Sequence, residues 1–352
     1  MEEQPIRVLV VDDSVFMRTV LKGAMERSSE ITVIGSAANG LDAVRRIKEL
    51  KPDVVTLDIE MPGMDGLGVL EEVMKDNPLP IVMVSTKTQE GAEMTFKALE
   101  LGAVDYVAKP LAKKDSSLQQ FQRDVISAIK TARASNTTER KSRSQTRVMP
   151  PRKLPSQVND LVIAIGISAG GPATLHKVIP QIPVEFPPIV IAQHMPPDFT
   201  GPFASRLNAA SQIEVKEAQS GDTLKPGRLL LAPGNRHMTV RKTVTGYTIG
   251  LNDGEKVSGF RPSADVLLGS VADSCGSKAI GLIMTGMGWD GAEGIRKLHA
   301  AGARTLSQDQ ESCVVYGMPK AAFETGCVDQ VVSLAAIPDA LAKCISESRV
   351  NA

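Results

Sequence analysis

The sequence lacks an excess of charge of either sign, because 40 Lys and Arg residues balance 40 Asp and Glu residues. Such a balance gives no sign of nucleic-acid or membrane-surface binding. No apolar run approaches the roughly 20 residues that cross a bilayer. The acidic N-terminus, Met-Glu-Glu-Gln-Pro, also lacks the apolar core of a signal peptide. We therefore expect neither nucleic-acid binding nor membrane insertion.

Cysteine is scarce as well. The four cysteines are widely spaced and show no metal-ligand pairing; they are Cys275, Cys313, Cys327 and Cys344. A reduced, cytoplasmic protein is the simplest interpretation. Hydrophobic residues nevertheless make up 42% of the 352 residues, which is ordinary globular composition at a length that suggests about two domains.

The composition changes in the middle of the chain. Residues 131–157 are rich in Ser, Thr, Pro and basic residues and have almost no apolar periodicity. The basic residues include Arg140, Lys141, Arg143, Arg147, Arg152 and Lys153, against the single acid Glu139. We interpret this stretch as a flexible basic linker between domains at 1–130 and 158–352. Contact of the linker with nucleic acid or an acidic partner is the alternative.

Five apolar runs in the first domain have the character of buried strands, and helical patterns lie between them. The runs cover residues 6–11, 31–34, 54–57, 81–84 and 105–108. Ser14 stands where it can cap the first intervening helix. This alternation predicts an α/β domain with a parallel sheet.

Reactive side chains follow these predicted strands. Asp12, Asp13 and Asp58 would place three carboxylates at one sheet edge, where ligands of such folds bind. Their mutual repulsion calls for a cation, and oxygen ligands suit Mg²⁺. A carboxylate beside Mg²⁺ and Lys109 can accept a phosphoryl group, with Ser85 as a hydrogen-bond donor. The alternative is that the acids merely solvate strand ends.

Residues 6 to about 130 resemble a response-regulator receiver domain. The residues that carry the resemblance are Asp12-Asp13, Asp58 with Met61-Pro62-Gly63-Met64-Asp65-Gly66, Ser85, Tyr106 and Lys109-Pro110. The resemblance implies a flavodoxin-like fold with strand order 2-1-3-4-5. It also implies that Asp58 accepts phosphate from a histidine kinase, and that Ser85, Tyr106 and Lys109 form the switch. Mg²⁺ would be held by Asp12, Asp13 and Asp58.

The second domain opens with a candidate nucleophile. The apolar run 161–165 enters Gly166-Ile167-Ser168-Ala169-Gly170-Gly171-Pro172, which has the G-x-S-x-G form of a nucleophile elbow. A Gly-rich turn after a strand also cradles phosphates, so nucleotide binding stays open. Against it, Ser168 occupies the middle glycine of the dinucleotide fingerprint, and the Gly-Lys-Ser/Thr ending of a Walker loop is missing.

A serine nucleophile needs a base. His194 ends the strand-like run 188–193, which places it at the same sheet edge as Ser168. His176 and His299 fall in helical patterns, and His237 falls in the loop 232–237. Placement at a strand end alone does not separate His194 from His237.

Asp290 is the candidate third group. It follows the strand-like run 279–285 and a glycine-rich loop, ahead of a helix that starts near Ala292. Its alternative role is to cap a helix. The chain order Ser, His, Asp differs from the α/β-hydrolase order, so that fold is disfavoured.

Residues 158 to about 347 resemble the catalytic domain of the chemotaxis protein-glutamate methylesterases, the CheB family. The matching segments are Gly166-Ile167-Ser168-Ala169-Gly170-Gly171, Gln193-His194-Met195-Pro196, Arg261-Pro262-Ser263 and Thr285-Gly286-Met287-Gly288-Trp289-Asp290-Gly291. The resemblance implies a parallel-sheet α/β catalytic domain in which Ser168 is the nucleophile, His194 the base and Asp290 the orienting acid. Thr is also common at Ala169, which leaves the oxyanion donors open.

The paired resemblance implies a phosphorylation-activated hydrolase that removes glutamate γ-methyl esters from methyl-accepting chemoreceptors and deamidates glutamines. Its partners would be those receptors and a chemotaxis histidine kinase. We expect a cytoplasmic monomer with no cofactor in the catalytic domain. The other readings are a binding module that has lost catalysis, a nucleotide-binding output and a DNA-binding output. The last is disfavoured because the second half shows α/β alternation and no short helix-turn-helix unit.

Overall fold

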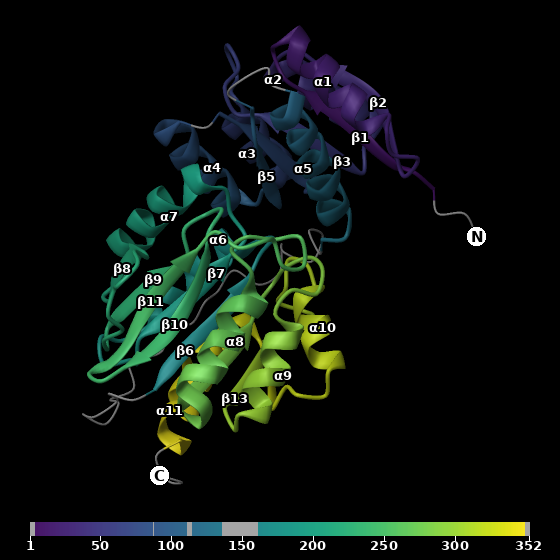
Figure 1. Ribbon diagram of the computed structural model, residues 1–352. Coiled ribbons are helices and arrows are strands. Elements are labelled where there is room, and N and C mark those ends of the chain that lie inside the picture. The colour runs from purple at the N-terminus through teal and green to yellow at the C-terminus, as the bar shows by residue number, and fades with distance from the viewer. Residues whose placement is uncertain (1–3, 87, 111–114, 136–160, 349–352) are drawn as a thin grey trace. The chain divides into compact units, whose positions relative to one another are not determined.

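The computed structural model describes residues 4–86, 88–110, 115–135 and 161–348 (Figure 1). The chain divides into two compact units, Met1–Ser142 and Arg143–Ala352. Most of the expected linker, residues 136–157, lies outside the described residues. No helix among the described residues is long and apolar enough to cross a membrane.

The first unit is built on a five-stranded sheet. Its strands are β1 (Ile6–Val11), β2 (Ile31–Ala37), β3 (Val54–Asp58), β4 (Ile81–Ser85) and β5 (Asp105–Ala108). They pair in the order β2-β1-β3-β4-β5, and every neighbouring pair is parallel. The strands are near-continuous apolar runs because helices cover both faces of such a sheet. The predicted flavodoxin-like order is confirmed.

The described residues of this unit also form five α-helices: α1 (Val15–Met25), α2 (Gly40–Leu50), α3 (Gly66–Asp76), α4 (Gln89–Leu101) and α5 (Asp115–Arg133). α1 packs on α5, while α2, α3 and α4 pack in a row. The predicted cap is present, since the Ser14 side chain accepts a hydrogen bond from the Met17 amide.

The expected end of the first domain at residue 130 is too early. α5 continues to Arg133. Thr131 and Ala132 are buried, and Ala132 extends an apolar stripe that includes Val125 and Ile129. Side chains spaced three or four residues apart share one helix face, so the burial of this face carries the helix past the change in composition.

The second unit contains a seven-stranded sheet. The strands are β6 (Val162–Ile167), β7 (Ile189–Gln193), β8 (Glu214–Glu217), β9 (Arg228–Leu231), β12 (Ala279–Ile283), β13 (Arg304–Gln308) and β14 (Gln330–Val332). Their order is β14-β13-β12-β6-β7-β9-β8, and all neighbouring pairs are parallel. The parallel α/β prediction for this domain is therefore confirmed, with β6 between β12 and β7.

The helices of the second unit are α6 (Gly171–Val178), α7 (Pro197–Ala210), α8 (Ala264–Cys275), α9 (Ala292–Ala300), α10 (Met318–Glu324) and α11 (Ile337–Glu347), with 3-10 turns at Ile179–Gln181, Gly276–Lys278 and Leu334–Ala336. α8 packs on β6 and β7 and lies beside α9 (Figure 1). Buried residues from α8, α9 and the central strands form one apolar core.

An antiparallel hairpin adds to this unit: β10 (His237–Thr243) pairs with β11 (Gly246–Asn252). The sequence interpretation placed His237 in a loop, and this is wrong, because His237 is the first residue of β10 and pairs with Asn252. β10 packs on α8, so the start of this strand lies against the start of that helix. His237 is buried as a result.

Candidate active site and phosphoryl-acceptor site

Two acids and a lysine meet at the carboxyl ends of the receiver strands. Asp12 follows β1, Asp58 ends β3 and Lys109 follows β5. The Lys109 Nζ lies 2.7 Å from Asp58 Oδ2 and 3.1 Å from Asp12 Oδ2. Both carboxylates are buried, whereas Asp13 is exposed beside them. The structure thus gathers four of the residues predicted for this site.

The environment of Asp58 makes its charge costly. Burial raises its pKa to about 6, although the hydrogen bond and the charge of Lys109 lower it and Asp12 raises it further. Burial lowers the pKa of Lys109, but its contacts with Asp58 and Asp12 outweigh that effect and raise it. Lys109 therefore stays protonated, and it is the positive charge available to oxygens that approach Asp58.

The three carboxylates suit a hard cation. Asp12, Asp13 and Asp58 each offer an oxygen, and these oxygens lie within 4.8 Å of one another. Asp12 Oδ2 is buried. It forms an ion pair with Lys109 but accepts no hydrogen bond from the described residues. An all-oxygen set with a buried, unsatisfied carboxylate oxygen fits Mg²⁺.

Ser85 and Tyr106 are the other two predicted switch residues. The Ser85 hydroxyl donates to the backbone oxygens of Gly91, at 3.1 Å, and Thr86, at 3.3 Å. Ser85 is therefore next to Asp58 in the sheet but directed at the first turn of α4. Burial, followed by the charge of Asp105, raises the pKa of Tyr106 well above its usual range, so its hydroxyl stays neutral.

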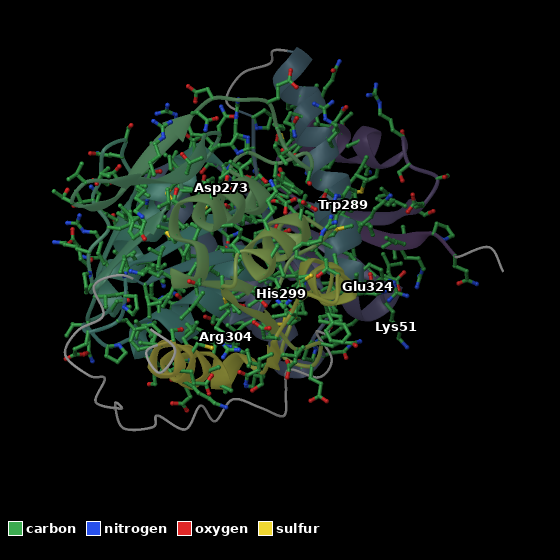
Figure 2. All side chains as sticks on the ribbon, turned by 60° about the horizontal axis from the view of Figure 1, so that its bottom comes forward. Lys51, Asp273, Trp289, His299, Arg304 and Glu324 are labelled. Carbon is green, nitrogen blue, oxygen red and sulfur yellow. The ribbon has the colours of Figure 1, made fainter. Side chains whose placement is uncertain are left out.

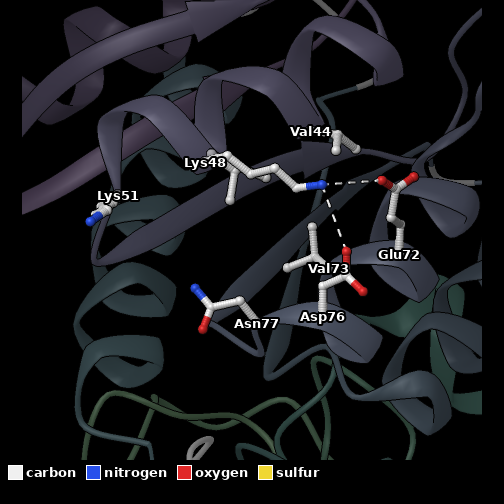
Figure 3. A pocket seen from close by; sticks show the side chains of 8 residues that line it. Val44, Lys48, Lys51, Glu72, Val73, Asp76 and Asn77 are labelled. Atoms are coloured by element: carbon white, nitrogen blue, oxygen red, sulfur yellow. Dashed lines mark ion pairs between the residues drawn. The ribbon is translucent and has the colours of Figure 1, made fainter.

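A hollow of about 190 Å³ between α2 and α3 is separate from these residues (Figure 3). Its lining residues are Val44, Ile47, Lys48, Lys51, Glu72, Val73, Asp76 and Asn77. Lys48 spans it, with its Nζ 3.7 Å from carboxylate oxygens of both Glu72 and Asp76. The pairs are exposed, so they contribute little to stability.

In the second unit, three neighbouring strands deliver the candidate catalytic residues. Ser168 follows β6, His194 follows β7, and the loop that holds Asp290 follows β12. Gly166 of β6 pairs with Ala192 of β7 and with Ile283 of β12. Register of this kind brings the three strand ends level, so their side chains meet at one sheet edge.

Ser168, His194 and Asp290 form a hydrogen-bonded row. His194 Nδ1 lies 3.0 Å from Ser168 Oγ, and His194 Nε2 lies 2.7 Å from Asp290 Oδ2. When Nε2 carries the proton that it donates to Asp290, Nδ1 is free to accept the serine proton. The ring is thus used in the opposite sense to the usual triad, in which Nε2 faces the serine.

The turn after Ser168 is held from two sides. Gly170 adopts φ +72°, and the Gly171 amide donates to the Ser168 carbonyl at 2.8 Å. The Gln193 side-chain amide donates to the carbonyl oxygens of Ser168 and His194, at 3.0 and 3.1 Å. Gln193 consequently couples the nucleophile turn to the loop of the base.

Asp290 is fully buried at the N-terminus of α8. Its Oδ1 accepts from the Ser263 hydroxyl at 2.7 Å and the Asp265 amide at 3.1 Å, and its Oδ2 accepts from the Ala264 amide at 2.7 Å. Burial acts to raise its pKa, but hydrogen bonds from His194, Ser263 and Ala264 hold the pKa below the usual value. Asp290 is therefore ionised at neutral pH.

Asp290 has both of the contacts that the sequence analysis considered, one with the histidine and one with a helix start. It contacts the imidazole of His194, and it also caps a helix. The capped helix is α8, far back in the chain, whereas the N-cap of the following helix α9 is Gly291. The N-terminal end of α8 carries partial positive charge, which favours the carboxylate.

Sequence reasoning gave no role to two neighbours of the row. The Phe260 ring stacks on His194, with centroids 3.7 Å apart and an angle of 7° between the planes. Ser263 caps α8 and donates to Asp290. A serine before an apolar helical pattern signals an N-cap, but no sequence pattern says which distant carboxylate its hydroxyl meets.

The remaining histidines take no part in the row. His237 Nε2 contacts the Glu255 carbonyl at 2.8 Å, and its Nδ1 accepts from the Ser263 amide at 3.3 Å. His176 lies in α6, and His299 in α9 faces Asp329 at 3.5 Å. The geometry therefore separates His194 from His237, which strand-end placement did not.

Comparison with known proteins finds one family for each unit. The family described as CheB methylesterase matches residues 163–341, and the family described as response regulator receiver domain matches residues 8–119. A crystal structure of the Thermotoga maritima CheB methylesterase catalytic domain is 40% identical with a TM-score of 0.51, and the match covers 52% of this chain and 97% of that one.

Relatives match this chain over nearly its whole length and theirs. A protein-glutamate methylesterase/protein-glutamine glutaminase of Sulfurimonas denitrificans is 46% identical over 350 residues, which is 98% of this chain and 99% of the relative. A Caulobacter vibrioides protein of the same name, numbered 1, is 45% identical over 98% and 99% of the two chains. This chain therefore belongs to the CheB family of protein-glutamate methylesterases/protein-glutamine glutaminases, with a receiver domain ahead of the methylesterase domain.

Proposed function

We propose that this protein is a phosphorylation-activated serine hydrolase that removes γ-methyl esters from glutamates of methyl-accepting chemoreceptors and deamidates selected glutamines. The observation that carries the proposal is the row of Ser168, His194 and Asp290, with a buried, ionised acid at its end. The names of the relatives supply the substrate class. We place the enzyme in the cytoplasm, as a monomer.

In the proposed reaction, Ser168 Oγ attacks the ester carbonyl while His194 Nδ1 takes the serine proton. Asp290 holds the imidazole in the required tautomer and stabilises the imidazolium that forms. Collapse of the tetrahedral intermediate breaks the carbon–oxygen bond, and methanol leaves with the proton from His194. Water then attacks the acyl-enzyme and gives glutamate. On glutamine, the same steps release ammonia.

The oxyanion needs donors close to Ser168. The Ala169 amide directly follows the nucleophile and donates no hydrogen bond within the described part of the chain. We assign it as one donor, together with an amide of the Met287 loop, which lies beside Ser168 through Gly286. Backbone donors aimed at a developing oxyanion are a major source of rate enhancement in acyl transfer.

Asp58 is the proposed phosphoryl acceptor, and a histidine kinase is the donor. Its carboxylate would attack the phosphorus of the kinase phosphohistidine, the P–N bond would break with the kinase imidazole as leaving group, and Lys109 would pair with the phosphoryl oxygens. Asp12, Asp13 and Asp58 would hold Mg²⁺, which neutralises charge on the transferring group when it is bound. Ser85 and Tyr106 would complete the switch once Ser85 turns from Gly91 toward the new phosphoryl group.

Regulation follows from tethering a phosphoryl acceptor to a hydrolase. We propose a receiver domain, a basic linker and a catalytic domain as functional parts, with the unphosphorylated receiver restraining the hydrolase. The linker keeps the two domains at high effective concentration. Phosphorylation of Asp58 would then release the restraint.

The decisive assay is methanol release from methyl-labelled receptor membranes, with and without a small phosphodonor. We expect the phosphodonor to stimulate release by the wild type. Ser168→Ala should lower release by at least about a thousandfold, and Asp58→Asn should remove the stimulation only. Asp76→Asn removes an exposed charge of the same unit and is the matched control.

Three results would contradict the proposal. Equal release by the wild type and Ser168→Ala would mean that another group is the nucleophile. Stimulation that survives Asp58→Asn would exclude Asp58 as the acceptor. No release by any form, with Asp58 still phosphorylated, would point to a binding output without catalysis.

A further inference from the structure

Helices α8 and α9 exchange their N-terminal caps. Asp290, which precedes α9, accepts from the Ala264 and Asp265 amides at the start of α8. In return, Asp265 Oδ1 accepts from the Gly291 amide at 2.9 Å and the Gly294 amide at 2.8 Å, at the start of α9. Each helix start is thus held by an acid that belongs to the other helix.

The N-cap residue of α9 cannot supply a side-chain acceptor for the first amides of the helix. The N-cap residue Gly291 has no side chain and adopts φ +99°. A Cβ there would come within 2.4 Å of Ile283 Cδ1, so a larger capping residue does not fit. Asp265 supplies the missing acceptor, and it binds the amide of the residue immediately after Asp290.

We propose that Asp265 is a positioning residue of the hydrolase: its carboxylate fixes the turn that carries Asp290 and places a second negative charge next to Asp290. The role rests on the proposed function, in which Asp290 orients the base. Asp265 is assigned no contact with substrate, and it acts through Asp290 alone.

The electrostatic part of this role concerns the proton on His194. The titratable and charged groups on α9 are Glu293, Arg296, Lys297 and His299, and those on β10 are His237, Arg241 and Lys242. Asp290 precedes α9, and His194 follows β7. Burial raises the pKa of Asp265 to about 6; amides of Gly294 and Gly291 act against this, and Asp290 adds to it. Asp265 is therefore mostly ionised at pH 7 and carries its charge next to Asp290.

The test uses the full-length chain, saturated with phosphodonor, and follows kcat and KM for methanol release from pH 5 to 9. The variants are Asp265→Asn, which keeps an oxygen acceptor but loses the charge, and Asp265→Ala, which loses both. Asp273→Asn is the matched control, because it removes a charge from an exposed position of the same helix (Figure 2).

Asp265→Asn removes a negative charge next to Asp290, so the protonated, inactive form of the catalytic row should be less favoured at low pH. We expect the acidic limb of kcat/KM to move down by about half a pH unit, with kcat at pH 8 within about threefold of the wild type. Asp265→Ala should lower kcat at least about tenfold with KM unchanged, because the turn loses its acceptor.

The proposal is overturned if the Asp265→Asn limb coincides with that of the wild type, or if Asp273→Asn moves it equally. It is also overturned if Asp265→Ala keeps the wild-type kcat. Should Asp265→Ala not fold, the isosteric Asp265→Asn variant decides. Absence of methanol release by the wild type would instead contradict the proposed function, and the inference would fall with it.

Discussion

At the residue scale, the carboxyl groups of Asp290, Asp58 and the partly exposed residue Asp105 show that burial alone does not set ionisation. Asp290 has a pKa below its usual value because His194, Ser263 and backbone amides of α8 all stabilise its charge against the effect of burial. Burial raises the pKa of Asp58 to about 6 even with Lys109 at 2.7 Å. Burial raises that of Asp105 to about 7, with only the Tyr106 amide among the groups that lower it. Partners, more than depth, decide which acid is charged.

Asp105 yields a prediction about stability and pH. Its folded pKa of about 7 exceeds the usual 3.8, so the folded protein keeps a proton that the unfolded chain releases. The free energy of unfolding should therefore fall as the pH rises from about 4 to about 7 and level off above that. In Asp105→Asn this loss should be smaller, as measured by urea unfolding of the full chain at several pH values.

Asp76→Asn serves as the control, because Asp76 is exposed on the same unit and pairs weakly with Lys48. Its unfolding midpoint should follow the wild type across the same pH range. Identical pH profiles for Asp105→Asn and the wild type would show that Asp105 does not titrate in this way.

At the element scale, the sequence predicted most of what strands and their ends determine. Apolar runs, alternating with helical patterns, correctly predicted all five receiver strands. They also predicted the three strands that precede Ser168, His194 and the Asp290 loop. The clustering of reactive residues could also be predicted, because parallel strands bring their carboxyl ends to one edge of the sheet. Roles within the two sites came from the resemblance, and they stay predictions until the variants are assayed.

What the sequence did not predict are contacts between distant elements. The β10–β11 hairpin changed the place of His237, and the cap of α8 by Asp290 joins residues 26 positions apart in the chain. α5 passed the expected boundary because burial of Ala132 outweighed the local composition. Local propensity carries no information about such tertiary partners.

The turn after Ser168 yields a second prediction. In Gly170→Ala, an alanine would be forced to φ +72° and its Cβ would lie 2.4 Å from Val314 Cγ2. The left-handed conformation costs about 1–2 kcal/mol, and the clash must move the turn that holds the nucleophile. We expect kcat for methanol release to fall at least about tenfold in a folded protein.

Gly221→Ala separates the two effects. Gly221 also has positive φ, at +89°, but a Cβ there meets nothing within 4 Å. Its thermal midpoint should fall through backbone strain alone, while kcat stays at the wild-type value. If Gly170→Ala likewise lost only stability, the turn would not position Ser168.

At the scale of the whole molecule, each unit has its own sheet and core. The methylesterase domain of the Thermotoga maritima relative was solved as a chain that this one covers to 97%, which supports independent folding of the second unit. The second unit therefore does not need the receiver to complete its own apolar core. The receiver is free to act as a regulator.

A chain that begins at Val158 tests this division. If the unphosphorylated receiver restrains the hydrolase, the shortened chain should release methanol several-fold faster than the unphosphorylated full chain and should ignore the phosphodonor. The comparison is of initial rates on the same receptor membranes, with circular dichroism as the check on folding. A shortened chain no faster than the full chain would show that the receiver does not inhibit.

The order of the catalytic residues along the chain also affects when they appear during protein synthesis. β6 pairs with β12 as well as β7, and His194 lies 96 residues before Asp290 in the chain. A ribosome that adds about 5–20 residues per second therefore completes the receiver many seconds before the last member of the catalytic row has emerged. The receiver domain is therefore complete on the nascent chain before the hydrolase is, so a restraint of the proposed kind would be in place from the moment that the catalytic row forms.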